Sequence, residues 1–503
     1  MTHRTRCTDL ILLLAGALLC LTRPVLADDG ACVPDARLLT AEQFLEQVRN
    51  AREYLEVLDT PVMERKTSDL GREVKVRERV PGKKGKFVER TVVRNEKVVE
   101  LSRRITIAAY DECDGTLHTV AVRVPHPLPA YRPLWRDMPN FVFTRLTPGY
   151  EVAHEGGVGI ARLKFSVKKD GRPLTVLAMK HPRIPSKYWR SRDPRVLGEV
   201  QPVVYSAYQR QYHGRAFTDA LVLAGVRRWI GDVRSALGTL QATGARSFAF
   251  PNELLSQVWP PEVLLMLGTI EQSDDAEFRE DPKRTAEAVA IEYAINSAPF
   301  YFSNSSADAI GPYQFTDNWK GDRPGTYSML VRKCTDARLD PSFQSGGRDL
   351  RNSMRAAICL LDVELARMPD DALRLFRDDY DVGVAYPVAA YNAGSGQAIK
   401  LYNEVPPEAL PDAARALELP VQAFQYRKAI ARGKKRALVR AVIVNNETRY
   451  YLVKMFTTWD IIEDWMTRAA DGDSTTTTRV SAGRPLQDAP MRAAEASVRL
   501  QIP

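Results

Sequence analysis

Glu271 is the residue whose position most favours chemistry, because it ends an apolar helical pattern. The apolar residues before it recur at helical spacing as Val263, Met266, Leu267 and Ile270. Its carboxylate is therefore expected at the edge of an apolar stripe. Such surroundings raise the pKa of a carboxyl group, which suits a general acid that must keep its proton near neutral pH. The alternative is a structural glutamate at a helix end that reaches solvent.

Three short motifs follow Glu271. They are Ala309-Ile310-Gly311-Pro312-Tyr313-Gln314-Phe315, Ala390-Tyr391-Asn392-Ala393-Gly394 and Glu447-Thr448-Arg449-Tyr450-Tyr451. With the preceding glutamate and in this order, they resemble the soluble-type lytic transglycosylases of bacterial cell walls, most of all the membrane-bound lytic murein transglycosylase D branch. The resemblance covers roughly residues 255–465 and does not extend to the first half of the chain.

The resemblance implies a lysozyme-like α-helical domain that acts on peptidoglycan without a cofactor. Enzymes of this family cleave the β-1,4 bond between N-acetylmuramic acid and N-acetylglucosamine and leave 1,6-anhydromuramyl ends. Most glycosidases use two carboxyl groups, whereas this family uses one. Glu271 would be that residue, first as general acid and then as base.

By the same resemblance, the later motifs supply residues that bind the sugar. Gln314 would orient near Glu271 or the sugar, and Tyr313 belongs to the same loop. Tyr391 would be the cleft tyrosine close to the acid, with Asn392 as its structural asparagine. The alternative for Tyr313 is a position in the core.

Two more residues complete the implied site. Ser305 falls where the family has a cleft serine, within a run of serines. Glu447 resembles the glutamate that closes the muramyl-binding side of the cleft. The alternative for Glu447 is a glutamate in the first turn of a helix, which the helix dipole favours.

The sequence departs from the family pattern directly after the acid. The family has serine there, whereas here Gln272 precedes Ser273. The stretch that follows, residues 272–308, is unusually long for the family and could form a lid or an extra cleft wall.

This insertion leaves a second function open. Asp274 or Asp275 could supply a second carboxylate and permit direct hydrolysis, as in goose-type lysozyme. A third hypothesis is a non-catalytic domain that holds glycan strands for an envelope machine.

Composition and pattern divide the chain into five segments. They are a signal peptide at 1–27, a mostly β domain of unknown role at 28–225, a helical linker at 226–250, a lysozyme-like domain at 251–470 and a tail at 471–503 expected to be disordered. The expected fold class is α+β multidomain, with a mostly β N-terminal domain followed by an α-helical lysozyme-like catalytic domain. An envelope protein is the partner expected for the β domain.

Local patterns predict the elements of the β domain. A helix is expected at 39–58 with Thr40 as its cap, and strands at 88–99, 102–108, 116–124, 158–167 and 173–178. The segment Lys169-Asp170-Gly171-Arg172 predicts a hairpin, and residues 83–86 a hairpin turn.

In the second half, helical patterns prevail. Helices are expected at 217–240, with Pro261 in the first turn of the Glu271 helix, and at 447–466. Residues Met354 to Met368 alternate four and three apart and predict one buried face. Gly394 is expected to end its helix as a left-handed cap.

The first residues read as an export signal. Arg4 and Arg6 precede an apolar run at 10–21, and Ala27 ends a small-residue cleavage site. The run is short for a membrane span. We therefore expect a periplasmic protein with no membrane span in the mature chain. The alternative is a retained anchor or lipid attachment at Cys20.

Four cysteines remain after the signal, and an even number in an exported chain fits disulfides. The economical pairing among three is Cys32–Cys113 and Cys334–Cys359. Buried free thiols are the alternative. The chain has no Cys-x-x-Cys and no His-x-x-x-His, so we expect no metal site.

The chain is basic, with 71 Lys and Arg against 62 Asp and Glu and a net charge of +9. This excess suits adhesion to an anionic cell-wall polymer. The basic residues form short runs rather than a stripe, so nucleic acid is not an expected partner.

Overall fold

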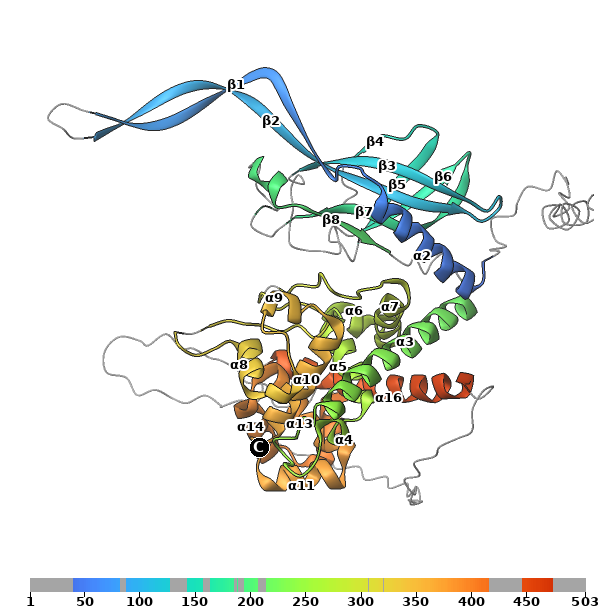
Figure 1. The fold of residues 1–503 in the computed structure, drawn as a ribbon, viewed down its shortest axis with the longest axis vertical. Helices are drawn as coiled ribbons and strands as arrows, with labels where there is room; N and C mark the ends of the chain where they lie inside the picture. Colours follow the sequence, from blue (N-terminus) through green and yellow to red (C-terminus); the bar gives the residue numbers. More distant parts are fainter. Residues whose placement is uncertain are drawn as a thin grey trace, which may run out of the picture.

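The protein has a mixed α+β fold that combines an antiparallel sheet with a larger group of helices (Figure 1). The computed structural model describes residues 39–81, 87–126, 143–156, 163–184, 188, 194–206, 214–305, 307–319, 321–415 and 446–473. Within these ranges, no helix combines the length and apolarity that a membrane span requires.

The described strands form an eight-stranded antiparallel sheet. Its order is β4-β3-β2-β7-β6-β5, with β1 paired to β2 and β8 paired to β7. The strands are β1 (Met63–Pro81), β2 (Phe87–Asp111), β3 (Thr116–His126), β4 (Thr144–Arg145), β5 (Tyr150–Gly156), β6 (Lys164–Lys169), β7 (Arg172–Arg183) and β8 (Gln201–Tyr205).

β2 is the longest strand, and it joins the two strands expected at 88–99 and 102–108 into one. Its pairing with β3 begins at Leu101. The described residues of β2 before Leu101 pair with β1. β1 and β2 therefore form a long two-stranded ribbon that projects from the sheet (Figure 1).

The hairpin between β6 and β7 was predicted and is confirmed. Lys169 pairs with Arg172 across a two-residue turn. Asp170 and Gly171 have φ angles of 51° and 78°, and a type I′ turn needs positive φ at both of these positions. The turn predicted at 83–86 lies outside the described residues.

The predicted N-terminal helix is confirmed as α2 (Ala41–Val57). Thr40 caps it through a capping box, in which its hydroxyl accepts the N–H of Gln43 and the Gln43 side chain accepts the N–H of Thr40. The buried face of α2, which includes Phe44 and Leu55, packs on β7 and against α3.

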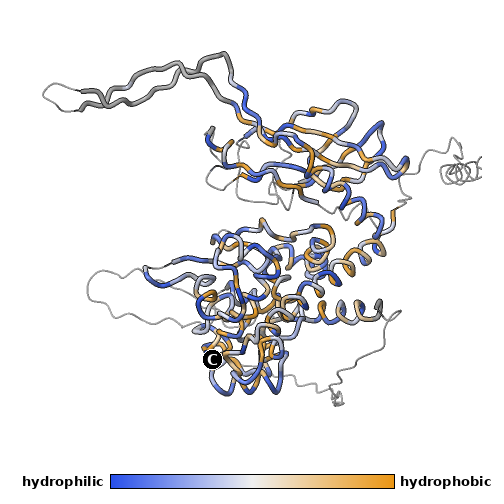
Figure 2. Tube along the Cα trace, in the orientation of Figure 1, coloured by the Kyte–Doolittle hydropathy of each residue, from blue (hydrophilic) through white to orange (hydrophobic). Residues whose placement is uncertain are grey.

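The helices form a separate group below the sheet in Figure 1. They are α3 (Arg215–Ala242), α4 (Leu255–Val258), α5 (Pro261–Gln272), α6 (Asp275–Glu280), α7 (Pro282–Ile295), α8 (Thr326–Lys333), α9 (Phe343–Gly346), α10 (Leu350–Leu365), α11 (Asp370–Asp378), α12 (Tyr380–Gly383), α13 (Ala385–Ala393), α14 (Ser395–Glu404), α15 (Leu410–Arg415) and α16 (Asn446–Asp473). Hydrophobic residues are spread through this group, including α3 (Figure 2).

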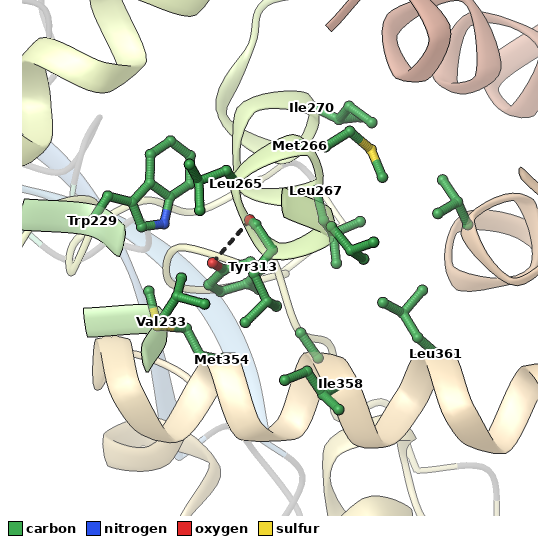
Figure 3. Packing of buried hydrophobic residues seen from close by; sticks show 14 of the residues in the cluster. Trp229, Val233, Leu265, Met266, Leu267, Ile270, Tyr313, Met354, Ile358 and Leu361 are labelled. Carbon is green, nitrogen blue, oxygen red and sulfur yellow. Dashed lines mark hydrogen bonds between the residues drawn. The ribbon is translucent and has the colours of Figure 1, made fainter. Parts of the chain in front are cut away.

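α3 belongs to the helical core, which corrects the linker expected at 226–250. Trp229 is fully buried and stacks on Tyr293 of α7, with ring centroids 4.0 Å apart. Figure 3 shows Trp229 and Val233 among the side chains of α5 and α10. Because these contacts lie in the middle of the core, residues 226–242 help to hold the helical group together.

Two other helical predictions can be compared with the structure. The buried face of α10 is confirmed, since Met354, Ile358 and Leu361 are each at most 1% exposed. Gly394 ends α13 with a positive φ of 80°, as predicted. Its ψ of 156° is extended, however, so it is not the left-handed helical cap that was expected.

The sheet and the helical group meet at α7. The Tyr205 hydroxyl of β8 donates to the buried Glu292 carboxylate over 2.9 Å. The Asn296 side chain bonds both the N–H and the carbonyl of Ser206, at 3.1 Å each. Arg52 of α2 also donates to Asn296. α7 lies in the long insertion, so the insertion connects the two parts of the protein.

The disulfide predicted between Cys334 and Cys359 is present and joins the end of α8 to α10. Cys113 is also disulfide-bonded. Its predicted partner, Cys32, lies outside the described residues.

Gly225→Ala tests the contact between α3 and α7. A methyl group at Gly225 would lie 1.9 Å from the carbonyl oxygen of Ala290, a backbone atom that cannot rotate away. We expect the free energy of unfolding to fall by about 2–3 kcal/mol, because overpacking must push the helices apart. Urea-induced unfolding measures the change.

Gly238→Ala on the same helix is the matched control. A methyl group there meets nothing within 4 Å, so we expect a gain of about 0.5–1 kcal/mol from helix propensity. Equal stabilities for the two variants would contradict the tight contact.

Candidate active site

Glu271 lies in the last turn of α5, where the helix leaves the core. Pro261 begins the helix, as predicted, and each residue from Val263 to Ile270 is buried. Glu271 follows this buried run directly after Ile270, and it is half-buried. Its carboxylate therefore lies at the boundary between core and solvent.

The surroundings of Glu271 favour its protonated form. Burial raises the pKa of its carboxyl group to about 7, and the carboxylate of Glu447 acts in the same direction. The Tyr451 hydroxyl donates a hydrogen bond to Oε1 of Glu271. This bond and the Lys454 ammonium favour the charged form and partly offset the effect of burial. A pKa near neutrality allows one group to give a proton and take one back.

α16 supplies the two groups that face the acid from the other side. Tyr451 is buried, and its own pKa is raised well above the usual range by burial and by the charge of Glu271. It therefore stays protonated and acts as a hydrogen-bond donor. Lys454 is buried as well and donates to the carbonyl of Ser273 over 2.7 Å.

The two acidic residues that follow Ser273 are held by structural partners. Asp274 caps α6 by accepting the backbone N–H groups of Ala276 and Glu277. Asp275 forms an ion pair with Lys454, with 2.6 Å between Oδ1 and Nζ. Each carboxylate thus has a structural partner.

Tyr391 lies near Glu271, as the motif predicts. Burial and the charge of Glu271 both raise the pKa of its phenol well above the usual range. Its hydroxyl donates to the backbone carbonyl of Tyr313 over 2.7 Å. α13 is thereby tied to the turn that carries Gln314.

Gln314 belongs to a polar network beside the acid but makes no hydrogen bond to it. Its Nε2 donates to the carbonyl of Gly311 at 2.7 Å and to the hydroxyl of Ser303 at 3.1 Å. Ser303 in turn donates to Oε1 of Gln272 at 2.9 Å. Gln272, the residue that departs from the family pattern, also donates to the carbonyls of Gly311 and Pro312 and so anchors the turn to α5.

Ser305 does not take part in this network. Its hydroxyl accepts the backbone N–H groups of Ala307 and Ala309, at 3.1 Å each, and the residue is exposed. Ser303, and not Ser305, is the serine that joins the network of Gln272 and Gln314. The two residues lie in one polar run that has no periodicity to distinguish them.

Tyr313 is also placed differently from its prediction as a sugar-binding residue. It is fully buried, and its hydroxyl donates to the carbonyl of Leu264 over 3.1 Å (Figure 3). Tyr313 is thus a core residue under α5, like Phe315. Its backbone carbonyl, which accepts from Tyr391, is its contribution to the site.

Asn392 and Glu447 lie where α13 meets α16. Asn392 accepts a hydrogen bond from the hydroxyl of Thr448 over 2.9 Å, which is the structural role predicted for it. Glu447 is exposed in the first turn of α16 and influences the titration of Glu271. It is therefore near the acid and open to solvent.

No family model, curated protein or solved structure matches this chain.

Sequence reasoning missed three residues of the site. Tyr451 is part of the third motif, but its side chain was not singled out. Lys454 lies three residues after Tyr451 in the same helix, so helical spacing from the third motif would have found it. Ser303 had no signal of its own beyond its polar neighbours.

One group of metal-ligand type lies in the sheet, away from Glu271. Oxygen and nitrogen atoms of Asp111, Asp114 and His118 lie within 4.8 Å of one another. Asp111 faces Arg172 in an ion pair, and Asp114 accepts from Thr116. These local partners explain the cluster, and we assign it no function.

The pKa of Glu271 predicts how Glu271→Gln changes thermal stability with pH. Between pH 4.5 and 7 the folded protein holds this proton more tightly than the unfolded chain does, so the wild type loses stability as the pH rises. Glutamine has no such dependence. We expect the variant to melt at nearly the wild-type temperature at pH 4.5 and on the order of 3 °C higher above pH 7.

Melting curves from pH 4.5 to 8 measure this difference. Glu292, whose pKa is also raised to about 7 by burial, titrates in both proteins and so cancels in the comparison. A constant difference across the pH range would contradict the raised pKa of Glu271.

Proposed function

We propose that this protein is a peptidoglycan lytic transglycosylase in which Glu271 is the single acid and base. The observation that carries the proposal is the half-buried carboxylate at the end of α5, with a pKa of about 7 and the Tyr451 hydroxyl on one oxygen. The substrate is proposed from the family that Glu271 and the three motifs after it resemble. Side chains or backbone groups of these motifs lie around this carboxylate.

In the first step, protonated Glu271 gives its proton to the glycosidic oxygen. The bond between that oxygen and C1 of N-acetylmuramic acid breaks, and the leaving N-acetylglucosamine keeps the proton as its 4-hydroxyl. Positive charge develops at C1 as the bond breaks. Glu271 is then a carboxylate, which the Tyr451 hydroxyl and the Lys454 ammonium stabilise.

In the second step, the Glu271 carboxylate takes the proton of the muramyl 6-hydroxyl. The 6-oxygen bonds to C1 of its own sugar, and the 1,6-anhydro ring forms. No water is consumed, and Glu271 returns to its protonated state. The two transfers run in opposite directions, so a pKa near the working pH serves both.

The places of the other carboxylates support this mechanism over direct hydrolysis. A hydrolase of the goose-type class needs a second carboxylate to activate water. Asp274 is held as a helix cap and Asp275 as a partner of Lys454. Glu447 remains as the exposed carboxylate near the acid, and we assign it to the muramyl side of the cleft.

We further propose that the protein works outside the cytoplasm. The disulfide between Cys334 and Cys359 fits an oxidising compartment such as the periplasm. Peptidoglycan, the proposed substrate, is found in the same compartment. The sheet, which carries none of the proposed catalytic groups, is the surface that we propose for an envelope partner.

Mass spectrometry of digested peptidoglycan tests the reaction. The wild type is expected to release fragments with anhydromuramyl ends, and Glu271→Gln to release at least 1,000-fold fewer, because glutamine cannot transfer a proton. Asp274→Asn is the matched control and is expected to keep most of the activity, because asparagine also caps a helix. Reducing muramic acid ends from the wild type would instead indicate hydrolysis, and a lack of soluble fragments would indicate a binding domain.

Tyr451→Phe tests how the hydroxyl tunes the acid. The hydrogen bond lowers the pKa of Glu271, so its loss raises that pKa further. We expect the alkaline limb of the kcat/KM profile to move to higher pH. Tyr450→Phe is the control, because its ring packs under Arg279 and makes no hydrogen bond to Glu271. An alkaline limb that stays in place or moves to lower pH would contradict this role.

A further inference from the structure

A pocket of about 760 Å³ lies on the helical group between α3, the segment after α7 and the start of α10. Three arginines line it: Arg228 from α3, Arg348 from just before α10 and Arg351 from the start of α10. Pro299, Tyr301 and Leu350 supply apolar surface beside them. The volume is in the range of sites for small organic ligands.

Arg348 is the cation that most needs an anionic partner. The residue is 6% exposed, and its guanidinium donates to the carbonyl of Tyr301 at 2.9 Å and to the Asn304 side chain at 3.3 Å. Both acceptors are neutral. Burial lowers the pKa of Arg348, and the nearby charge of Arg183 lowers it further. A buried guanidinium bonded only to neutral groups is stabilised by an anion that enters the pocket.

The other two arginines have different partners. Arg351 is exposed and forms an ion pair with Asp232, in which its Nε donates to Oδ1 over 2.9 Å and its Nη2 lies 2.9 Å from the same oxygen. Arg228 donates to the carbonyl of Tyr293 in the last turn of α7 and to the carbonyls of Asn296 and Ser297, which follow the helix. Asp349, the remaining carboxylate of the lining, caps α10. Three guanidinium groups therefore stand against two carboxylates, Asp232 and Asp349, so the lining has a net charge of +1.

These features select a carboxylate on a small organic molecule. A guanidinium matches a carboxylate with two parallel N–H donors. The apolar walls favour a ligand with aliphatic carbon next to its charge. A short peptide with a free carboxylate has both features.

The pocket is connected to the acid through one segment of chain. Tyr301 lines the pocket, and Ser303, two residues later, bonds Gln272 next to Glu271. Gly311 packs directly on Gly347, the residue before Arg348. A methyl group at Gly311 would lie 1.9 Å from the carbonyl oxygen of Gly347. The pocket and the site thus share the segment between α7 and α8.

We propose that this pocket binds the C-terminal carboxylate of the peptide that peptidoglycan carries on its muramyl residues. The assignment rests on the proposed function, because it makes the pocket a second contact for the same substrate. The carboxylate lies against Arg348, and the aliphatic part of the peptide lies against Pro299 and Leu350.

Gly231→Phe is designed to fill the pocket. Gly231 lines the pocket from α3, and a Cβ atom added there meets nothing within 4 Å, so a larger side chain has room to start into the pocket. Gly238→Phe is the matched control, on the same helix, equally open and outside the pocket lining. Both replace a helical glycine, so both are expected to fold.

Calorimetric titration of the full-length protein with the tetrapeptide L-Ala-γ-D-Glu-L-Lys-D-Ala tests binding. We expect the wild type and Gly238→Phe to bind equally and Gly231→Phe to bind at least tenfold more weakly. A peptide with an amidated C-terminus is expected to lose at least fivefold. No binding by the wild type, equal binding by Gly231→Phe, or equal binding of the amidated peptide would overturn the proposal.

Cleavage assays identify the source of the peptide. On peptide-bearing glycan we expect Gly231→Phe to lower kcat/KM at least fivefold, with no change on glycan stripped of its peptides. Unchanged cleavage of both substrates, despite lost peptide binding, would overturn the assignment to the substrate. If the wild type cleaves neither glycan, the transglycosylase proposal fails, while the titration still decides whether the pocket binds the peptide.

Discussion

The position of one carboxylate between core and solvent governs the arrangement of this protein's site. Glu271 is held there because α5 is buried along almost its whole length and ends where the helix leaves the core. A deeper position would keep the carboxyl group protonated and cut off from solvent, and an exposed one would leave it with an ordinary pKa. Tyr451 and Lys454 then adjust the balance from α16. The geometry depends on α5 and α16 staying in contact.

The insertion after Glu271 maintains this contact in a way that its sequence alone did not suggest. Its first helix, α6, meets α16 through the ion pair of Asp275 with Lys454 and through Arg279, which lies 3.6 Å from the centre of the Tyr450 ring. Its second helix, α7, packs on α3 and bonds β8. One segment therefore supports the site at one end and the sheet at the other, where a lid or an extra cleft wall was expected.

The sequence predicted those features that depend on periodicity and local turn chemistry. The capped helix α2, the hairpin at Asp170 and Gly171, the buried face of α10 and Pro261 at the start of α5 were all correct. Local patterns carry these features because each is stabilised within a few residues of chain.

The errors concern side-chain direction in irregular segments and the packing of distant helices. Ser303 and Ser305 differ only in which way a loop turns, so composition could not separate them. Tyr313 enters the core because the turn around it brings its ring under α5. Tyr451 reaches Glu271 from 180 residues away, and spacing along the chain cannot show such a contact.

The ribbon of β1 and β2 sets a length scale for anything that binds this protein. Residues 87–100 of β2 run beyond the rest of the sheet, and at about 3.4 Å per residue they extend on the order of 45 Å. That is longer than the roughly 30 Å diameter of a small domain. A structure attached near Pro81 and Phe87 would therefore hold the rest of the protein at a distance greater than the width of such a domain, and Glu271 could reach many positions around a single point of attachment.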